Sequence, residues 1–284
     1  MENKNNKSEN PDNLLVRCSS LHNLMTKGTG KSPKDKYLDA MKSLYEKEEK
    51  YRSTANKETK TAMKLVDTIA ELKATIKALK PYKNDLLLSE TCRTWIKKIA
   101  QEAFYGYKTQ VNSKYCDKGN MVEDDSIELL NSVLFTDYKK NVDRKQAQHA
   151  EGVEWLTGEC DIYSASDRLI RDIKSSWSIE TFPAFQEDAE KKIKGAGYDW
   201  QMRGYMILWN ASKAIIDVCL VDTPPELLSD YDNWELHEVE HIAPEKRITS
   251  VVVERSESIE VEIMERYNAA NKFYKECINQ LKSK

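Results

Sequence analysis

Apolar residues recur at helical spacing along several stretches of the chain. Between Thr59 and Lys80 they fall on one side of a helix, and Pro81 ends the pattern because proline lacks the amide hydrogen of a helix interior. This predicted stripe consists of Met63, Val66, Ile69, Leu72 or Lys73, Ile76 and Leu79. Ser89 is a residue type that caps helix N-termini, and it precedes a second stripe. That stripe consists of Trp95, Ile96, Ile99 and Phe104.

The same spacing predicts helices over 35–52, 123–133 and 198–209, and a final one through Val261, Met264, Tyr267 and Ile278. Short apolar segments typical of strands lie at 153–163, 168–174, 214–221 and 248–253. This order predicts an α/β fold with a mixed central sheet, flanked by helices and preceded by a helical insertion. The predicted parts are a disordered polar tail over 1–12, an N-terminal segment with the insertion over 13–118, and a core with a C-terminal helix over 119–284.

The composition is that of a globular protein. The chain has 284 residues, of which 40% are hydrophobic and 32% charged, so it can bury a sizeable core. No apolar run approaches the roughly 18 residues of a membrane span, and the polar N-terminus lacks the apolar stretch of a signal peptide. We therefore expect a cytoplasmic protein without a membrane partner. Six cysteines without a Cys-x-x-Cys pair predict reduced thiols, not a disulfide framework, a zinc site or an iron–sulfur cluster.

Charge is divided unevenly along the chain. Residues 27–118 hold 21 Lys and Arg against 12 Asp and Glu, whereas residues 119–284 hold 20 against 32. A basic segment beside an acidic domain is typical of proteins that bind a polyanion. A lysine-rich helix that is merely solvated remains the alternative.

Two short motifs point to other chemistry but lack the context it needs. The stretch Lys27–Ser32 (KGTGKS) ends like a phosphate-binding loop, yet Met25 occupies the place of the first glycine and the preceding LHNLM favours a helix over a strand. His237–His241 (HEVEH) matches the zinc-protease motif H-E-x-x-H, which requires a helix. Pro244 and the surrounding residues favour a solvated loop or edge strand instead.

The stretch GECDIYSASDRLIRDIKSSWS, residues 158–178, places acids and a lysine on two neighbouring strands. Asp161 at the end of one strand and Asp172 on the next can converge on one point, and carboxylates held together attract hard cations such as Mg²⁺. Lys174 shares a strand face with Asp172 because side chains two residues apart point the same way. The pattern therefore favours a metal site with an ammonium group beside it.

Four ordered motifs resemble those of the PD-(D/E)xK nuclease superfamily, in particular its bacteriophage lambda-exonuclease-like (YqaJ-type) and RecB-type branches. They are Gly119–Glu123 (GNMVE), Gly158–Asp161 (GECD), Asp172–Lys174 (DIK) and Gln201–Tyr205 (QMRGY). Val16–Lys31 is also similar to the N-terminal substrate-binding segment of the lambda-exonuclease-like enzymes. The resemblance implies a restriction-endonuclease-like core.

The resemblance also implies a role for each matching residue. Glu123, Asp161 and Asp172 would bind the metal together with the backbone carbonyl of Ile173, and Lys174 would be the catalytic lysine.

Gln201 and Tyr205 would contact substrate and brace the site, and Ser19 would bind a 5′-phosphate. The arginine that precedes this serine in the relatives has no counterpart near Asp12, and Cys219 and Cys277 alone do not replace the cysteine trio of the iron–sulfur members.

The implied function is that of a DNA exonuclease that uses Mg²⁺ or Mn²⁺, with two ions, and acts on linear double-stranded DNA in phage recombination or DNA processing. The implied assembly is a ring-shaped trimer, with a single-strand annealing protein as a further partner. A RecB-type single-strand nuclease or endonuclease is the alternative within the superfamily. From another class, a DNA-binding module with a vestigial nuclease site remains open.

Overall fold

The computed structural model describes residues 12–27, 31, 33–82, 88–109, 113–149 and 152–283. Apart from Asp12, the predicted disordered tail lies outside these residues. The chain forms two compact units. Residues up to His22 and 105–261 make one, called the core unit below, and residues 23–104 with the segment from Glu262 onward make the other, the helical unit.

This division differs from the predicted boundary at residue 119. The N-terminal segment belongs to the core unit because β1 (Val16–Arg17) pairs in parallel with β3 (Glu154–Gly158). β2 (Lys145–Gln148) pairs with the other edge of β3 in the antiparallel sense, which gives a three-stranded sheet of order β1-β3-β2.

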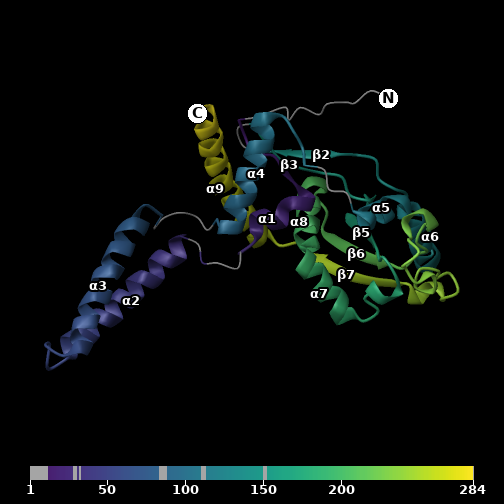
Figure 1. The fold of residues 1–284 in the computed structure, drawn as a ribbon. Coiled ribbons are helices and arrows are strands. Elements are labelled where there is room, and N and C mark those ends of the chain that lie inside the picture. Colours follow the sequence, from purple (N-terminus) through teal and green to yellow (C-terminus); the bar gives the residue numbers. More distant parts are fainter. Residues whose placement is uncertain are drawn as a thin grey trace. The chain divides into compact units, whose positions relative to one another are not determined.

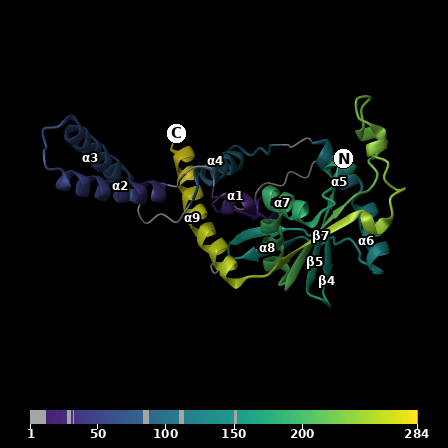
Figure 2. The same ribbon diagram turned by 90° about the horizontal axis from the view of Figure 1, so that it is seen from below.

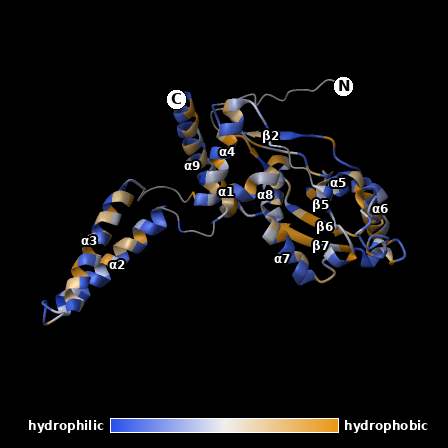
Figure 3. Cartoon of the chain, in the orientation of Figure 1, coloured by the Kyte–Doolittle hydropathy of each residue, from blue (hydrophilic) through white to orange (hydrophobic). Residues whose placement is uncertain are grey.

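A second sheet of four strands confirms the predicted mixed α/β fold. Its order is β4 (Ile162–Ser164), β5 (Leu169–Ser175), β6 (Lys213–Cys219) and β7 (Ile248–Glu254). β5 and β6 run parallel, and the two outer pairs run antiparallel. These strands include the strongly hydrophobic segments of the core unit, as expected for a sheet covered by helices (Figure 3).

The strand predicted over 153–163 is two strands in different sheets. β3 ends at Gly158 and β4 begins at Ile162. Between them, the carbonyls of Cys160 and Asp161 accept hydrogen bonds from Asn141, at 2.9 Å from its side chain and 2.6 Å from its backbone N–H. These contacts from a loop replace strand pairing at this point, and the sequence pattern did not indicate them.

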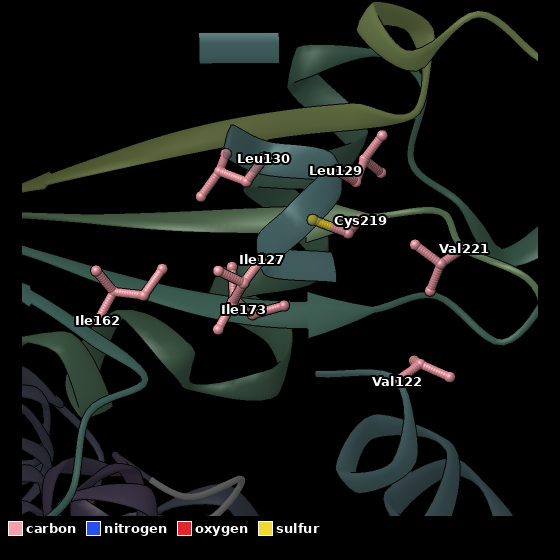
Figure 4. Close-up of a cluster of buried hydrophobic side chains, with 8 residues drawn as sticks. All are labelled: Val122, Ile127, Leu129, Leu130, Ile162, Ile173, Cys219 and Val221. Atoms are coloured by element: carbon pink, nitrogen blue, oxygen red, sulfur yellow. The ribbon is translucent and has the colours of Figure 1, made fainter. Parts of the chain in front are cut away.

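Helices cover both faces of the four-stranded sheet (Figures 1 and 2). α6 (Glu123–Leu134) packs its apolar residues onto Ile162, Ile173 and Cys219 of one face (Figure 4). α8 (Tyr198–Trp209) contacts β5 and β6, and α7 (Gln186–Ala196) contacts β7. Because side chains alternate along a strand, Asp172 and Lys174 point to the face opposite Ile173.

α5 (Lys114–Met121) and α7 have no counterpart among the predicted helices. The one buried residue of α5 is Lys118, and only Ala189 and Ile193 of α7 are buried, so neither helix carries an apolar stripe. α1 is Leu21–Met25, the helix expected from LHNLM. Short 3₁₀ helices are η1 (Cys18–Ser20), η2 (Lys80–Tyr82), η3 (Ile179–Thr181), η4 (Pro225–Leu227), η5 (Trp234–Leu236) and η6 (Pro244–Lys246).

The helical unit contains α2 (Pro33–Ser53), α3 (Lys60–Leu79), most of α4 (Glu90–Tyr105) and most of α9 (Glu257–Lys282). α2 and α3 pack against each other, and Lys73 of α3 forms an ion pair of 2.8 Å with Glu48 of α2. The predicted cap is confirmed, since Ser89 accepts a hydrogen bond from the backbone N–H three residues later. Thr59, which was not predicted as a cap, accepts the same kind of bond at the start of α3. Within the described part of the chain, no helix has the length and apolar content of a membrane span.

The predicted stripe of α3 is partly wrong. Met63 is 61% exposed and Val66 is 46% exposed, whereas Ala62 and Leu65 are buried. The buried face therefore begins one residue earlier in the chain, where the small side chain of Ala62 occupies a position that a search for large apolar residues passes over.

Two glycines bring η1 close to the main body of the core unit. A Cβ atom at Gly158 of β3 would lie 2.7 Å from Cys18 Sγ and 2.7 Å from Tyr205 Cε1. A Cβ atom at Gly204 of α8 would lie 2.8 Å from the same sulfur. All three distances are shorter than the contacts that real Cβ atoms make, so these glycines allow the segment Cys18–Ser20 to pack directly on β3 and α8.

We predict that Gly204→Ala destabilises the protein by about 1–3 kcal/mol, because the added methyl group overpacks the contact with Cys18. The loss should be smaller by roughly 1 kcal/mol in a Cys18→Ala background, where the sulfur is absent. Urea unfolding measures both values. Gly195→Ala in α7 is the control, since nothing lies within 4 Å of its Cβ position. Equal effects of the two glycine substitutions would refute the packing argument.

Candidate active site

Asp161 and Asp172 lie side by side at the edge of the four-stranded sheet. β4 and β5 pair with Ile162 opposite Arg171, and this register extended by one residue places Asp161 opposite Asp172. Side chains of directly opposite residues share one face of an antiparallel pair. The backbone N–H of Ile173 donates a hydrogen bond of 2.6 Å to Asp161 Oδ2, which fixes that carboxylate beside β5. The two acids therefore converge as predicted.

Asp172 is fully buried, with 0% exposure. Its Oδ2 atom contacts the ammonium group of Lys174 as an ion pair. Its Oδ1 atom, by contrast, has no hydrogen-bond partner among the described residues. Buried carboxylate oxygens normally accept hydrogen bonds. The unbonded lone pairs of Asp172 therefore remain available to a ligand that the protein itself does not supply.

Burial and mutual repulsion shift the pKa values of the two acids upward. Burial raises the pKa of Asp161 to about 8, with the charge of Asp172 as the next cause. Burial also raises the pKa of Asp172, against the opposing effect of Lys174. For Lys174, burial disfavours the cation, but the charges of Asp172 and Asp161 outweigh it and raise the pKa. Lys174 is therefore protonated, and its positive charge favours ionisation of two acids that burial and mutual repulsion disfavour.

Tyr198 is a residue of the site that sequence reasoning missed. The ammonium group of Lys174 lies 4.9 Å from the centre of its ring, within the range of a cation–π interaction. Tyr198 is the first residue of α8, so this contact ties the N-terminal end of the helix to Lys174. An aromatic residue three positions before Gln201 was the only signal in the sequence.

Gln201 and Tyr205 are buried on α8 and bonded to each other. The Gln201 Nε2 atom donates a hydrogen bond of 2.9 Å to the Tyr205 hydroxyl, as one helical turn between them allows. The Tyr205 ring packs edge-on against Trp209, with 5.9 Å between ring centres. At 8% and 4% exposure, these side chains brace the helix. Their predicted contact with substrate stays a prediction.

Glu123 begins α6, as predicted, but its carboxylate is engaged elsewhere. Lys140 Nζ lies 2.9 Å from Glu123 Oε2. A hydrogen bond of 3.0 Å between Ser126 and Ser175 holds the first turn of α6 against β5. The charge of Glu123 contributes to the raised pKa of Asp161, so the two groups are electrostatic neighbours. Even so, the described residues contain no cluster of three His, Cys, Asp or Glu side chains with metal-binding geometry.

Ser19 is exposed on η1, which packs on α8 and β3. Its carbonyl accepts a hydrogen bond of 3.1 Å from His22 Nδ1. The adjacent Cys18 is buried, and burial raises the pKa of its thiol, with a smaller contribution from the charge of Asp172. The N-terminal segment is thus in the neighbourhood of the acids, although no described contact joins the Ser19 hydroxyl to them.

A buried lysine that the sequence did not reveal anchors the ends of β5 and β6. Lys118 Nζ donates hydrogen bonds to the carbonyls of Ser176 and Val221 at 2.7 and 2.9 Å and to the Thr223 hydroxyl at 2.8 Å. It also donates to the carbonyl of Trp177 at 3.1 Å. Burial lowers the pKa of Lys118 to about 8. Its role is to hold the segment that follows Lys174.

Neither alternative motif forms a site in the described residues. His237 follows η5 in a turn, so HEVEH is not helical. The expectation of a solvated segment is wrong for His237, which is 4% exposed and bonded through Nδ1 to Thr223 at 3.0 Å. The nucleotide motif at Lys27–Ser32 falls largely outside the described residues.

Comparison with known proteins gives matches among solved structures. No protein-family model and no curated protein matches the chain. A phage-related exonuclease from Haemophilus somnus 129PT is 32% identical, with 95% of this chain and 97% of that chain covered and a TM-score of 0.69. An alkaline exonuclease from Laribacter hongkongensis is 11% identical over 95% of this chain and 92% of that one, with a TM-score of 0.55, which shows a shared fold. Because the identity with the first of these extends over nearly the whole of both chains, the protein belongs to the lambda-exonuclease-like (YqaJ-type) branch of the PD-(D/E)xK nuclease superfamily.

Proposed function

We propose that the protein is an exonuclease that hydrolyses the phosphodiester bonds of linear double-stranded DNA with the help of Mg²⁺ or Mn²⁺. Membership of the family supports the nuclease activity, and the 32% identical relative is described as a phage-related exonuclease. The observation that carries the metal dependence is the fully buried carboxylate of Asp172, whose Oδ1 atom has no hydrogen-bond partner among the described residues.

The donor set fits a hard divalent cation. Mg²⁺ and Mn²⁺ prefer oxygen ligands, and Asp161 and Asp172 offer carboxylate oxygens at one edge of the sheet. Within a strand, the N–H and C=O of one residue point to the same edge, so the Ile173 carbonyl faces the side on which its N–H bonds Asp161. Glu123 would complete the set after release from Lys140. Whether two ions bind, as the resemblance implies, stays a prediction.

Each residue then has a role that its own geometry allows. A cation held by these carboxylates would supply an acidified water and neutralise charge on the scissile phosphate. Lys174 carries a positive charge at neutral pH, so it stabilises negative charge that develops on the phosphate instead of removing a proton. Tyr198 and Asp172 both contact its ammonium group.

Recognition of DNA is assigned to other parts of the chain. The exposed Ser19 is the proposed contact for a terminal 5′-phosphate. The excess of lysine and arginine in residues 27–118 would provide phosphate contacts that do not depend on sequence. Among these lysines, Lys73 already pairs with Glu48. A ring-shaped trimer and an annealing-protein partner remain predictions from the family resemblance.

Nuclease activity tests the proposal with one substitution, one control substitution and two substrates. Linear duplex labelled at its ends should be degraded with Mg²⁺ and untouched in EDTA. Lys174→Met should lower the rate by about 100- to 1000-fold, because it removes a positive charge that acts on the transition state. Lys139→Met removes an exposed ammonium group that pairs with Asp137 and should leave the rate unchanged. Cleavage of covalently closed circles would contradict the requirement for an end and favour a RecB-type endonuclease.

The raised pKa of Asp161 predicts how stability depends on pH when no metal is present. The folded state holds a proton on Asp161 up to about pH 8, whereas the unfolded chain releases it near pH 4. This group therefore contributes stability at low pH that is lost as pH rises towards 8. Asp161→Asn keeps the acceptor for the Ile173 N–H without the charge, so it should stabilise the protein at pH 9 in EDTA by about 1–3 kcal/mol.

The measurement is urea unfolding in EDTA between pH 4 and pH 9. The difference between variant and wild type should grow across this range and be smallest at the acidic end. A difference that is constant with pH would show that Asp161 is not under electrostatic strain in the folded protein.

A further inference from the structure

The loop between α6 and β2 is fixed at two points. At its start, Asn131 of α6 donates to the Tyr138 carbonyl at 3.0 Å and accepts from the Tyr138 N–H at 2.8 Å. Further along, the backbone N–H of Asn141 donates to the Asp161 carbonyl at 2.6 Å, and its side chain donates to the Cys160 carbonyl at 2.9 Å. Lys140 lies between these anchors, so its backbone is held beside the carboxylates of the site.

From this position Lys140 reaches Glu123. Its ammonium group is 2.9 Å from Glu123 Oε2 and 4.0 Å from Asp124 Oδ1. The Glu123 side chain is 20% exposed, whereas Asp124 is 79% exposed, so the more sheltered carboxylate has the closer contact. The charges of Glu123, Asp124 and Asp161 all favour the protonated form of Lys140.

The site therefore contains a second built-in cation. Lys174 compensates Asp172, and Lys140 compensates Glu123. Even with all three acids ionised, two ammonium groups against three carboxylates leave a formal charge of only minus one to attract a divalent ion. In addition, the Glu123 oxygen that contacts Lys140 cannot serve a metal fully while that contact persists.

We infer that Lys140 is a counter-cation that occupies Glu123 in the metal-free protein and competes with the divalent ion for it. The inference rests on the proposed metal site and adds a residue that opposes binding of the divalent ion. It explains why Asp161 and Asp172 are already together while Glu123 does not form a metal-binding cluster with them. Lys140 acts on the metal through Glu123, so it is a positioning residue.

The neighbouring Lys139 supplies a matched control. It forms an ion pair of 2.6 Å with Asp137, with both side chains largely exposed at 78% and 83%. Lys139→Met and Lys140→Met each remove one ammonium group from adjacent positions, and the second also removes the longer contact of 4.0 Å with Asp124. Only the second removes a charge from Glu123.

The test is a titration of each variant with Mn²⁺ in the absence of DNA, in which electron paramagnetic resonance measures the free ion. Lys140→Met should bind Mn²⁺ about threefold to tenfold more tightly than wild type, as expected for loss of one competing ion pair. Lys139→Met should match wild type, and Lys140→Arg, which keeps the charge, should stay close to it. A disturbed fold would weaken binding, so a gain in affinity cannot arise from structural damage.

Unchanged or weaker binding by Lys140→Met would overturn the inference. Asp172→Asn separates this outcome from failure of the metal site itself. If wild type binds Mn²⁺ and Asp172→Asn does not, the site stands and only the role of Lys140 is at stake. If wild type shows no binding that depends on Asp172, both the metal site and the inference are wrong.

Discussion

A carboxylate buried next to a second carboxylate is unfavourable unless a cation lies beside both. Asp172 and Asp161 are in this position, and the ammonium group of Lys174 is the cation that the chain itself provides. The surrounding structure maintains the arrangement. The Ile173 N–H holds Asp161, and the Tyr198 ring holds Lys174 from the side of α8. The electrostatic cost of the two acids is the reason that a divalent ion should bind here.

Packing on the far side of the sheet determines which residues face this site. Ile173 is buried in the cluster under α6, and strand alternation then turns Asp172 and Lys174 towards α8. Gly158 and Gly204 allow η1 to approach β3 and α8, which brings the exposed Ser19 into the same region. Lys118 donates hydrogen bonds to the carbonyls of Ser176 and Val221, which follow β5 and β6, and so fixes the chain after Lys174. The site is thus a product of the sheet and of the helices on both of its faces.

Local patterns predicted the parts of this arrangement that depend on neighbours in sequence. The spacing of Asp172 and Lys174 set their common face, and the apolar pattern placed α8 over Tyr198–Trp209. Contacts between distant segments had no local signal. Lys140 reaches Glu123 because Asn141 is hydrogen-bonded to residues about twenty positions later. The buried residue of α5 is Lys118, so this helix has no apolar stripe that the sequence pattern could show. For the same reason, no local pattern indicated that the strand predicted over 153–163 divides after Gly158.

Lys174 and Lys140 both offset negative charge of the carboxylates. In the metal-free protein, Glu123 is therefore not yet placed to bind a divalent ion with Asp161 and Asp172. Crystals soaked in Mn²⁺ would locate the ion through its anomalous scattering. The account predicts a peak at roughly 2.0–2.4 Å from carboxylate oxygens of both Asp161 and Asp172, with Glu123 turned away from Lys140 towards the ion. A peak elsewhere, with Asp172 still in contact only with Lys174, would contradict it.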